Sequence, residues 1–413
     1  HGFVRVGKNG RLELKDGLPA RFWGVVIGGR SVNTPKYFIE KTVETLARAG
    51  VNLIRLLVEP AEQDKWGEAM NADFLDRLDY WIAASKKKGI YSSVSLNLID
   101  SLDSPTVTFS KISLGIQKSL IGSFAASHKN AYTGLTYAED PAVAFFEIGN
   151  GKSLLSEPGA WTKMPEPYWK EFNLLWNNWL EKQYRSTTRL QAAWTNASGI
   201  SALAASESLE KKNISLPGMD DTPFDQAILA PYHDPLRSPA RRSDAVRFAM
   251  AVQRSYFEEM SEYLSRLGIR VPILAAARND LLPITAVASQ TLNMTAGESY
   301  YDYPTESSRK ELSGLELFSM RNPVTERGAW SFAPNIARTH WSGSPVVLKA
   351  WTACWPNPFR SASVLGVAAY SCFQGVDVVV HDNYLTIGDL MRIGSFGLQA
   401  DPARWGLFGL AAK

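Results

Sequence analysis

The run Ala142-Val143-Ala144-Phe145-Phe146-Glu147-Ile148 is typical of a β-strand buried on both faces, because its apolar residues follow one another instead of alternating with polar ones. Seven more apolar runs, separated by helical stretches, lie at residues 21–26, 51–56, 90–98, 271–275, 293–300, 345–350 and 376–381. Such strands alternating with helices predict an α/β fold, a closed parallel (β/α)8 TIM barrel. The alternative is an open doubly wound sheet, which the absence of a Gly-rich phosphate loop after the first strand disfavours.

Helix signals fill the segments between the strands. The hydroxyl of Thr34 as a cap, followed by Pro35, predicts a helix start, and Gly50 predicts the end of that helix. A long helix is expected from a cap at Ser243 to Gly268.

The chain is expected to form a single barrel domain over residues 1–413. Residues 1–20 alternate apolar and polar positions around Asn9-Gly10, which predicts an N-terminal β-hairpin. The region 156–243 lies between the fourth strand and the long helix, and we expect it to be a partly helical insertion.

The composition disfavours several classes of protein. The 413 residues are 45% hydrophobic and 21% charged, as in a soluble globular protein, and a net charge of +3 is too small to suggest a nucleic-acid binder. No apolar run reaches the roughly 20 residues that a transmembrane segment needs. Cys354 and Cys372 form neither a metal-ligand pattern nor a disulfide framework, and we expect no metal and no cofactor. The chain opens at His1 without a signal peptide, as expected of a processed chain or an excised domain.

A family resemblance extends over nearly the whole chain in order. It is carried by residues 22–25 (FWGV), 50–55 (GVNLIR), 76–80 (DRLDY), 130–144 (NAYTGLTYAEDPAVA) and 356–361 (PNPFRS). These stretches resemble bacterial cellulase-like proteins of glycoside hydrolase clan A, near family 5. The resemblance implies a polysaccharide or oligosaccharide ligand and an extracellular or periplasmic location. It also leaves room for a further domain or a protein partner.

The catalytic positions of that family are substituted here. Retaining members use two carboxyl groups about 5–5.5 Å apart, one as acid/base and one as nucleophile. The resemblance places the acid/base at Gly151, within Glu147–Leu154 (EIGNGKSL), and the nucleophile at Ala350, within Leu348–Thr352 (LKAWT). Neither residue can titrate, so we expect the retaining mechanism to be absent.

Other residues are expected at the mouth of the barrel. The resemblance implies that Arg55 holds the nucleophile carboxylate and that Asn150 binds a sugar hydroxyl. Arg55, Asn150 and Asn97, which ends the third strand nearby, are the candidate substrate-binding residues. Without a nucleophile, Arg55 is expected either to bind an acidic sugar or to form a salt bridge with Glu147. Glu298 is either a stand-in acid or base or the ion-pair partner of Lys349 or Lys152.

The predicted mouth also contains aromatic and histidine side chains. Trp351 and Trp355, after the seventh strand, are the candidates for stacking on a sugar ring. Tyr300 and Tyr301 end the sixth strand, and His381 and Tyr384 follow the eighth. Because active sites of (β/α)8 barrels lie at the carboxyl ends of the strands, His381 is a second candidate for proton transfer.

Three functions are consistent with these features. The first is a carbohydrate-binding pseudoenzyme, which binds sugar without turnover. The second is an active glycosidase or lyase that uses other groups, with Glu298, His381 or Asp382 as candidates. The third is a structural or assembly protein that has no saccharide affinity, since a fold alone does not establish a function.

Overall fold

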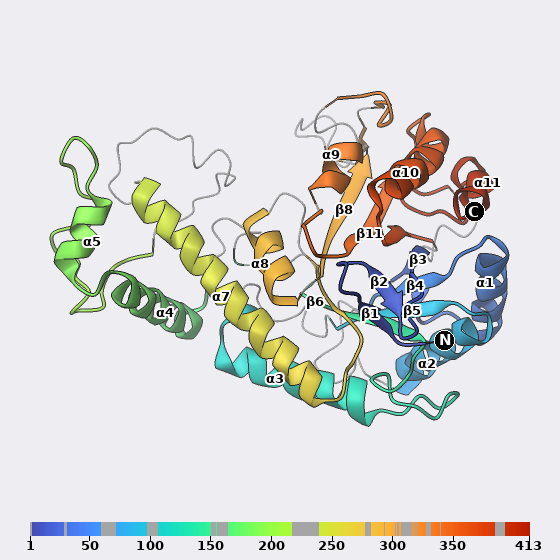
Figure 1. The fold of residues 1–413 in the computed structure, drawn as a ribbon, viewed down its shortest axis with the longest axis horizontal. Coiled ribbons are helices and arrows are strands. Elements are labelled where there is room, and N and C mark those ends of the chain that lie inside the picture. The colour runs from blue at the N-terminus through green and yellow to red at the C-terminus, as the bar shows by residue number, and fades with distance from the viewer. Residues whose placement is uncertain are drawn as a thin grey trace. The chain divides into compact units, whose positions relative to one another are not determined.

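Eight parallel strands close into a barrel (Figure 1). The computed structural model describes residues 2–28, 31–58, 72–96, 106–149, 154, 164–216, 239–276, 282–292, 294–301, 303, 305–306, 316–318, 320–327, 332–338, 340–384 and 393–413. In chain order the barrel strands are β3 (Phe22–Ile27), β4 (Leu53–Leu56), β5 (Tyr91–Ser95), β6 (Val143–Ile148), β7 (Ile273–Ala276), β8 (Thr295–Tyr301), β11 (Val346–Ala353) and β12 (Val378–His381). Each overlaps one predicted apolar run, so the predicted (β/α)8 barrel is confirmed.

The amino-terminal half of the barrel interior is filled by apolar side chains. Inward-facing residues from the barrel strands form one cluster, which includes Phe22, Leu53, Tyr91, Phe145, Leu274, Ala296, Val347 and Val378. The ring of Phe22 meets the rings of Tyr91 and Phe145 edge-on, with centroids 5.5 and 6.2 Å apart. This close packing makes the barrel a core rather than a pore, and polar inward side chains are found nearer the carboxyl ends of the strands.

A two-stranded hairpin packs against this apolar cluster. Strands β1 (Val4–Val6) and β2 (Leu12–Leu14) pair antiparallel, as the sequence predicted. Val4 and Leu12 belong to the same buried cluster as Phe22. Arg11 Nε donates to Asp377 Oδ1 over 2.9 Å, and Asp377 directly precedes β12. The hairpin therefore packs on the amino end of the barrel.

Helices occupy the connections between strands. They are α1 (Lys36–Arg48), α2 (Ala72–Lys87), α3 (Lys111–Ile121), α4 (Glu166–Tyr184), α5 (Thr187–Trp194), α7 (Pro239–Arg266), α8 (Leu282–Leu292), α9 (Phe332–Ala337), α10 (Arg360–Gln374) and α11 (Pro402–Ala411). Helix α1 buries Ile39, Thr42, Val43 and Leu46, spaced three to four residues apart on one face. Short 3-10 and π turns lie at Thr106–Thr108 and Gly122–Ser127.

Two predicted helix caps were wrong. The Thr34 hydroxyl donates to the carbonyl oxygen of Ser31 over 2.7 Å, and Pro35 occupies the cap position of α1. Helix α7 begins at Pro239, so Ser243 lies inside its first turns. In the first case the Thr34 hydroxyl bonds back to Ser31 instead of capping the helix.

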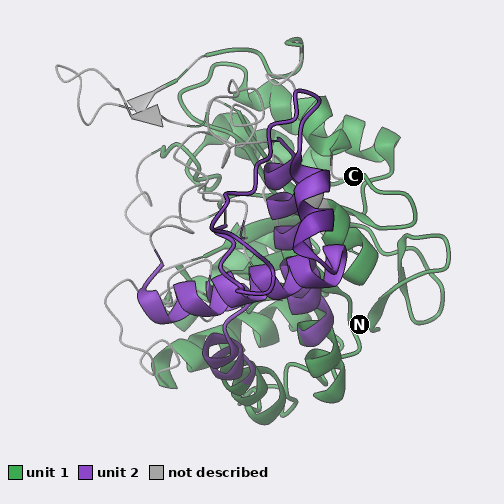
Figure 2. Cartoon of the chain, turned by 90° about the vertical axis from the view of Figure 1, so that its left-hand side faces the viewer, with its two compact units in different colours: residues 1–101, 119–151, 260–413 green, residues 102–118, 152–259 purple. Residues whose placement is uncertain are grey.

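The chain divides into two compact units, coloured in Figure 2. The first contains residues 1–101, 119–151 and 260–413 and holds the whole barrel. The second contains residues 102–118 and 152–259, which include the whole of the predicted insertion at 156–243. In the second unit Trp176 stacks on Trp179 and Trp194, with ring centroids 5.7 and 6.3 Å apart, so this unit has an apolar core of its own. The assignment of residues 1–413 to a single domain stays a prediction.

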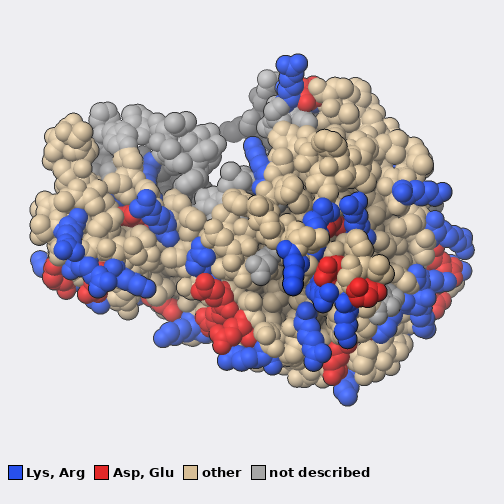
Figure 3. All heavy atoms as spheres, viewed as in Figure 1, with Lys and Arg blue, Asp and Glu red and all other residues tan. Residues whose placement is uncertain are grey.

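Charges are mixed over the molecular face drawn in Figure 3, where Lys and Arg are interspersed with Asp and Glu. No helix in the described part of the chain has the length and apolar character needed to cross a membrane.

Candidate functional site

Ionisable side chains from five strands meet inside the carboxyl-terminal half of the barrel. They are Arg55 on β4, Glu147 on β6, Glu298 on β8, Lys349 on β11 and Asp382 directly after β12. We call this set the mouth cluster. Its place follows from the parallel topology, because all eight strands present their carboxyl ends at the same end of the barrel, where active sites of this fold are built.

Arg55 and Glu147 form a buried ion pair. Arg55 Nε donates to Glu147 Oε2 over 2.7 Å, and Nη2 donates to Oε1 over 2.6 Å. The side chains are 4% and 0% exposed. Burial alone would raise the pKa of Glu147, but the charges of Arg55 and Lys349 hold that pKa below its ordinary value. The salt-bridge alternative for Arg55 is confirmed, and its role as a cation for an acidic sugar is not supported, because the guanidinium is already bound to a carboxylate.

The Lys349 side chain points into the barrel at an irregularity in β11. The pairing of β11 with β8 shifts register between Leu348 and Ala350, which inserts one extra residue into β11 as a β-bulge does. Lys349 Nζ lies 4.0 Å from Glu147 Oε1 and 3.7 Å from Glu298 Oε2, and the side chain is only 2% exposed. Burial lowers the pKa of Lys349, against the opposing effect of the two carboxylates. The predicted pairing of Glu298 with Lys349 is confirmed.

Ala350, the expected nucleophile position, is buried and lies opposite Glu298 in the β11–β8 register. In-register neighbours on parallel strands share a face of the sheet, so the Ala350 methyl group faces the barrel interior beside Glu298. No group at this position can attack a sugar or transfer a proton.

Asp382 and Tyr300 form a second polar contact at the mouth. Tyr300 OH donates to Asp382 Oδ2 over 2.6 Å. Burial raises the pKa of Asp382, and the neighbouring charge of Glu298 acts in the same direction, while the bond from Tyr300 and the charge of Arg55 oppose the rise. Glu298 is 27% exposed, so it is more accessible to a ligand than Arg55 or Lys349.

Aromatic rings lie beside this contact. The rings of Tyr300, Tyr303 and Phe396 are mutual neighbours, with centroid separations between 5.5 and 6.0 Å. Tyr303 is largely exposed, and Tyr300 and Phe396 are partly so. Trp355 is 40% exposed, and its backbone N–H donates to the carbonyl oxygen of Ser395, the residue before Phe396. These four aromatic residues, the aromatic rim below, provide apolar faces next to the mouth cluster.

The structure corrects the placement of Trp351 and His381. Both are completely buried. The Trp351 ring packs near Trp23 and His381, with centroids 6.2 and 5.0 Å apart, and His381 packs near Phe408 of α11. Because α11 lies outside the barrel wall, Trp351 has no face for a sugar. Burial lowers the pKa of His381 well below its ordinary value, so a neutral imidazole is expected there.

Two predicted tyrosines are also enclosed by protein. Tyr301 OH lies 2.8 Å from Ser299 Oγ, and its ring packs edge-on against Phe332. Tyr384 is buried against Trp405 of α11. Neither contributes a ring to the aromatic rim. Asn97, Asn150 and Gly151 lie outside the described residues.

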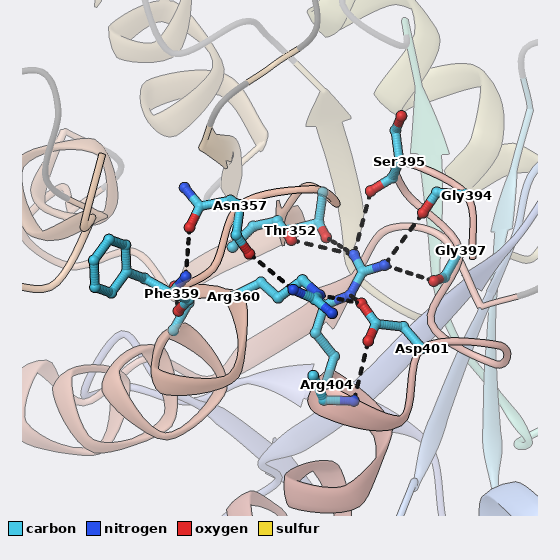
Figure 4. Close-up of polar contacts among 12 residues, drawn as sticks. Thr352, Asn357, Phe359, Arg360, Gly394, Ser395, Gly397, Asp401 and Arg404 are labelled. Atoms are coloured by element: carbon cyan, nitrogen blue, oxygen red, sulfur yellow. Dashed lines mark hydrogen bonds and ion pairs between the residues drawn. The ribbon is translucent and has the colours of Figure 1, made fainter. Parts of the chain in front are cut away.

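The buried side chain of Arg404 donates hydrogen bonds to the backbone of residues 394–397 (Figure 4). Arg404 on α11 donates to the carbonyl oxygens of Gly394, Ser395, Phe396 and Gly397, and to Thr352 Oγ1 over 2.8 Å. Asp401 accepts from Arg404 Nε and from Arg360 Nε, each over 2.7 Å. This network positions the backbone that carries Phe396.

Sequence reasoning missed two members of the aromatic rim. Tyr303 and Phe396 both follow barrel strands, β8 and β12, and loops after strands belong to the mouth. Their position after these strands was the sequence signal that could have identified them as residues of the mouth. The described residues contain no group of three His, Cys, Asp or Glu side chains able to hold a metal ion.

No protein-family model and no curated protein sequence matches the chain. Solved structures share its fold. The endo-1,4-β-mannanase from Rhizomucor miehei has a TM-score of 0.59 at 13% identity, over 100% of this chain and 99% of that one. The glycoside hydrolase family 5 mannosidase from the same organism has a TM-score of 0.59 at 10% identity, over 100% and 97%. The β-galactosidase from Halorubrum lacusprofundi has a TM-score of 0.61 at 15% identity, over 94% of this chain and 57% of that one. At these identities the likeness is one of fold, and it agrees with the (β/α)8 barrel.

Proposed function

We propose that this barrel binds a saccharide at its mouth and does not hydrolyse it by the retaining two-carboxylate mechanism. The proposal is carried by one observation: Ala350 places a methyl group beside Glu298 at the position where the family resemblance requires a nucleophile. Gly151, the matching acid/base position, also lacks an ionisable side chain. Losing general acid–base catalysis alone typically costs about 10²–10⁴-fold in rate, and losing the nucleophile removes the covalent step.

The remaining carboxylates are poor replacements for a nucleophile. Glu147 is fully buried, and both of its oxygens accept hydrogen bonds from Arg55. Glu298 Oε2 lies 3.7 Å from Lys349 Nζ, so this carboxylate faces a neighbouring cation. A carboxylate stabilised by a fixed cation is a weaker nucleophile, because the ion pair is lost when its charge moves to the sugar.

The aromatic rim supports the binding part of the proposal. Partly exposed aromatic faces suit the C–H face of a sugar ring, and Trp355 and Tyr303 have the most accessible rings at the mouth. We propose Trp355, Tyr300, Tyr303 and Phe396 as the stacking surface. Linear β-1,4-linked mannose and glucose oligosaccharides are the first ligands to test, because the barrels of similar fold include mannanases. Such ligands agree with the proposed extracellular or periplasmic location.

A second candidate function rests on Asp382. Its pKa is raised by burial, and no such rise accompanies the ion-paired Glu147. A carboxyl group with a raised pKa is a candidate acid, and Glu298 is the more exposed carboxylate of the same cluster. Asp382 as acid with Glu298 as base would support hydrolysis or β-elimination by a different geometry.

A paired assay separates these functions. The wild-type chain is titrated calorimetrically with mannohexaose and cellohexaose, and the same mixtures are analysed for new reducing ends and for unsaturated products. Binding without products supports the proposal. Products that disappear in Glu298→Gln and Asp382→Asn support the second candidate. No binding of any saccharide on a glycan array favours a scaffold protein and overturns the proposal.

A further inference from the structure

In the mouth cluster both cations and Glu147 are buried, and the more accessible charged side chains are the carboxylates of Glu298 and Asp382. Arg55 and Lys349 are almost inaccessible, whereas Glu298 is 27% exposed and Asp382 is partly exposed. A ligand entering the mouth therefore meets carboxylate oxygens before it meets either cation. An anionic sugar gains little from cations that it cannot reach and whose charge is already shared with carboxylates.

The cluster also has an excess of acidic groups. Arg55 and Lys349 face three carboxyl groups, Glu147, Glu298 and Asp382. With all five groups ionised, the cluster carries one net negative charge. Because most of these side chains are buried, this charge favours a cationic ligand group more strongly than it would in water. Burial raises the pKa of Asp382, and the charge of Glu298 adds a smaller contribution in the same direction.

A buried hydroxyl adds a possible acceptor on the same face of the barrel. Ser95, the last residue of β5, is in register with Glu147 on β6, so the two side chains share the inner face. Ser95 Oγ is fully buried and has no hydrogen-bond partner among the residues that the structure describes. Buried polar atoms usually have a partner, so this hydroxyl is an unsatisfied polar group that faces the interior of the barrel near Glu147.

The aromatic rim favours a positive charge independently of these oxygens. Aromatic faces attract cations through the ring quadrupole, with a free energy of about 0.5–1 kcal/mol at exposed sites. The rings of Tyr300, Tyr303 and Phe396 surround one another next to Asp382, which accepts the hydrogen bond from Tyr300. Rings beside carboxylates are the combination that recognises ammonium groups.

We infer that the mouth selects saccharides that carry a free, protonated amino group, such as glucosamine oligomers, with Glu298 as the residue that determines this specificity. This inference rests on the proposed saccharide binding and adds the chemical class of the ligand. The ammonium group of the sugar would bind Glu298 beside Lys349. It would also lie against the rings of the aromatic rim. Acetylating the amine removes both interactions while leaving the sugar backbone unchanged.

The test compares three oligosaccharides of equal length by titration calorimetry. They are β-1,4-glucosamine hexamer, its fully N-acetylated counterpart, and a hexamer of galacturonate. We expect the amine to bind about tenfold more tightly than the N-acetyl sugar, as one charge-assisted hydrogen bond would provide, and the uronate to bind most weakly. Equal affinity for the first two, or preferred binding of the uronate, overturns the inference.

Two variants locate the effect. Glu298→Gln keeps the shape of the side chain and removes its charge, so the preference for the amine should fall to about twofold or less while binding of the N-acetyl sugar persists. The matched control is Glu262→Gln, which removes an exposed carboxylate near the end of α7, a helix that leads into the amino end of β7. A tenfold preference that persists in Glu298→Gln contradicts the role of Glu298.

The outcomes also separate this inference from the proposed function. If neutral oligosaccharides bind and the amine has no advantage, the proposed function stands and only the inferred specificity fails. If none of the three sugars nor mannohexaose binds, both fail. Thermal unfolding of each variant verifies that the chain remains folded, so that a loss of binding can be assigned to the mouth.

Discussion

Arg55 and Glu147 face each other from β4 and β6 and exchange two hydrogen bonds of 2.7 and 2.6 Å inside the barrel. The strand between them, β5, contributes the small side chains of Ser93 and Ser95 at this level of the barrel, beyond the larger Tyr91 at its amino end. The long Arg55 and Glu147 side chains therefore reach across β5. In the resemblance to retaining glycosidases this arginine holds the nucleophile, whereas here it holds a different carboxylate.

Breaking this pair is expected to destabilise the barrel. Arg55→Met or Glu147→Leu leaves one charge buried without its partner, which typically costs about 3–5 kcal/mol. The double variant Arg55→Met/Glu147→Leu should cost clearly less than the sum of the two single variants. Unfolding in urea, monitored by tryptophan fluorescence, gives all three free energies. Additive losses would mean that the two side chains do not interact.

The buried Asp401 predicts a pH-dependent stability. Burial alone would raise its pKa, but Arg360 and Arg404 hold the pKa of Asp401 below its ordinary value. The folded protein therefore binds the Asp401 proton more weakly than the unfolded chain does. The resulting stability is fully present above the unfolded pKa, about 3.9, and is lost as the pH falls through the folded value.

Asp401→Asn should accordingly destabilise the protein by on the order of 3 kcal/mol at pH 7. The deficit should stay nearly constant from pH 7 down to about pH 4 and shrink below that, because the wild type then loses its contribution while the variant has none to lose. Urea unfolding at a series of pH values measures this difference. Glu262→Gln serves as the exposed control, for which a small effect at every pH is expected. A deficit for Asp401→Asn that grows toward acid pH would contradict the linkage.

The two tryptophans near the end of β11 should respond oppositely to truncation. Trp351→Ala leaves a cavity between β11, Trp23 and His381, so we expect a loss of about 3–5 kcal/mol in stability. Trp355→Ala removes an exposed ring and should leave the unfolding free energy within about 1 kcal/mol while weakening saccharide binding several-fold. Unfolding curves measure the stability of both variants, and calorimetric titrations measure their saccharide affinity. A normal affinity in Trp355→Ala would mean that Trp355 does not belong to the proposed stacking surface.

This contrast illustrates what the sequence could and could not predict. The barrel strands were predictable because their runs are continuously apolar, as buried parallel strands require. The β11 bulge between Leu348 and Ala350 has no comparable sequence signal, and a shift of one residue moves every later side chain to the other face. Trp351 therefore faces α11 instead of the mouth.

The sequence predicted that ion pairs would form inside the barrel, but it did not determine which partner each side chain would choose. Arg55, Glu147, Glu298 and Lys349 all lie in predicted strands, so opposite charges had to meet in a small space. The aromatic rim was only partly predictable. Tyr303 and Phe396 come from different loops. The contact between their rings depends on the backbone course of residues 394–397, which Arg404 fixes by donating hydrogen bonds to their four carbonyl oxygens.

Arg404→Leu should release that segment. The variant removes the donors to residues 394–397, so the backbone bonds from Trp355 to Ser395 and from Leu398 to Asn383 lose their support. We expect faster hydrogen exchange at the amides of Trp355 and Leu398, with little change in β4 and β5. Hydrogen exchange followed by mass spectrometry tests this, and uniform acceleration over the whole barrel would indicate global destabilisation instead.

Restoring the two carboxyl groups tests whether the mouth could still support catalysis. In Gly151→Glu/Ala350→Glu we expect slow hydrolysis of an aryl β-mannoside, where each single variant shows less than a tenth of that rate. The buried position of Ala350, beside Glu298, should also lower the stability of the variant. Release of the aryl group is measured by absorbance, and thermal unfolding monitors the fold. Equal rates in the double and single variants would show that the two positions do not act together.

The most direct test of the central claim is a measurement of binding and turnover in the same solution of wild-type protein. The protein is mixed with mannohexaose and, separately, with the β-1,4-glucosamine hexamer, and calorimetric affinity is followed by quantification of reducing ends after a day. The account predicts measurable affinity for at least the amino sugar and no products above those in buffer. Steady release of shorter oligosaccharides, abolished by Glu298→Gln, would contradict it.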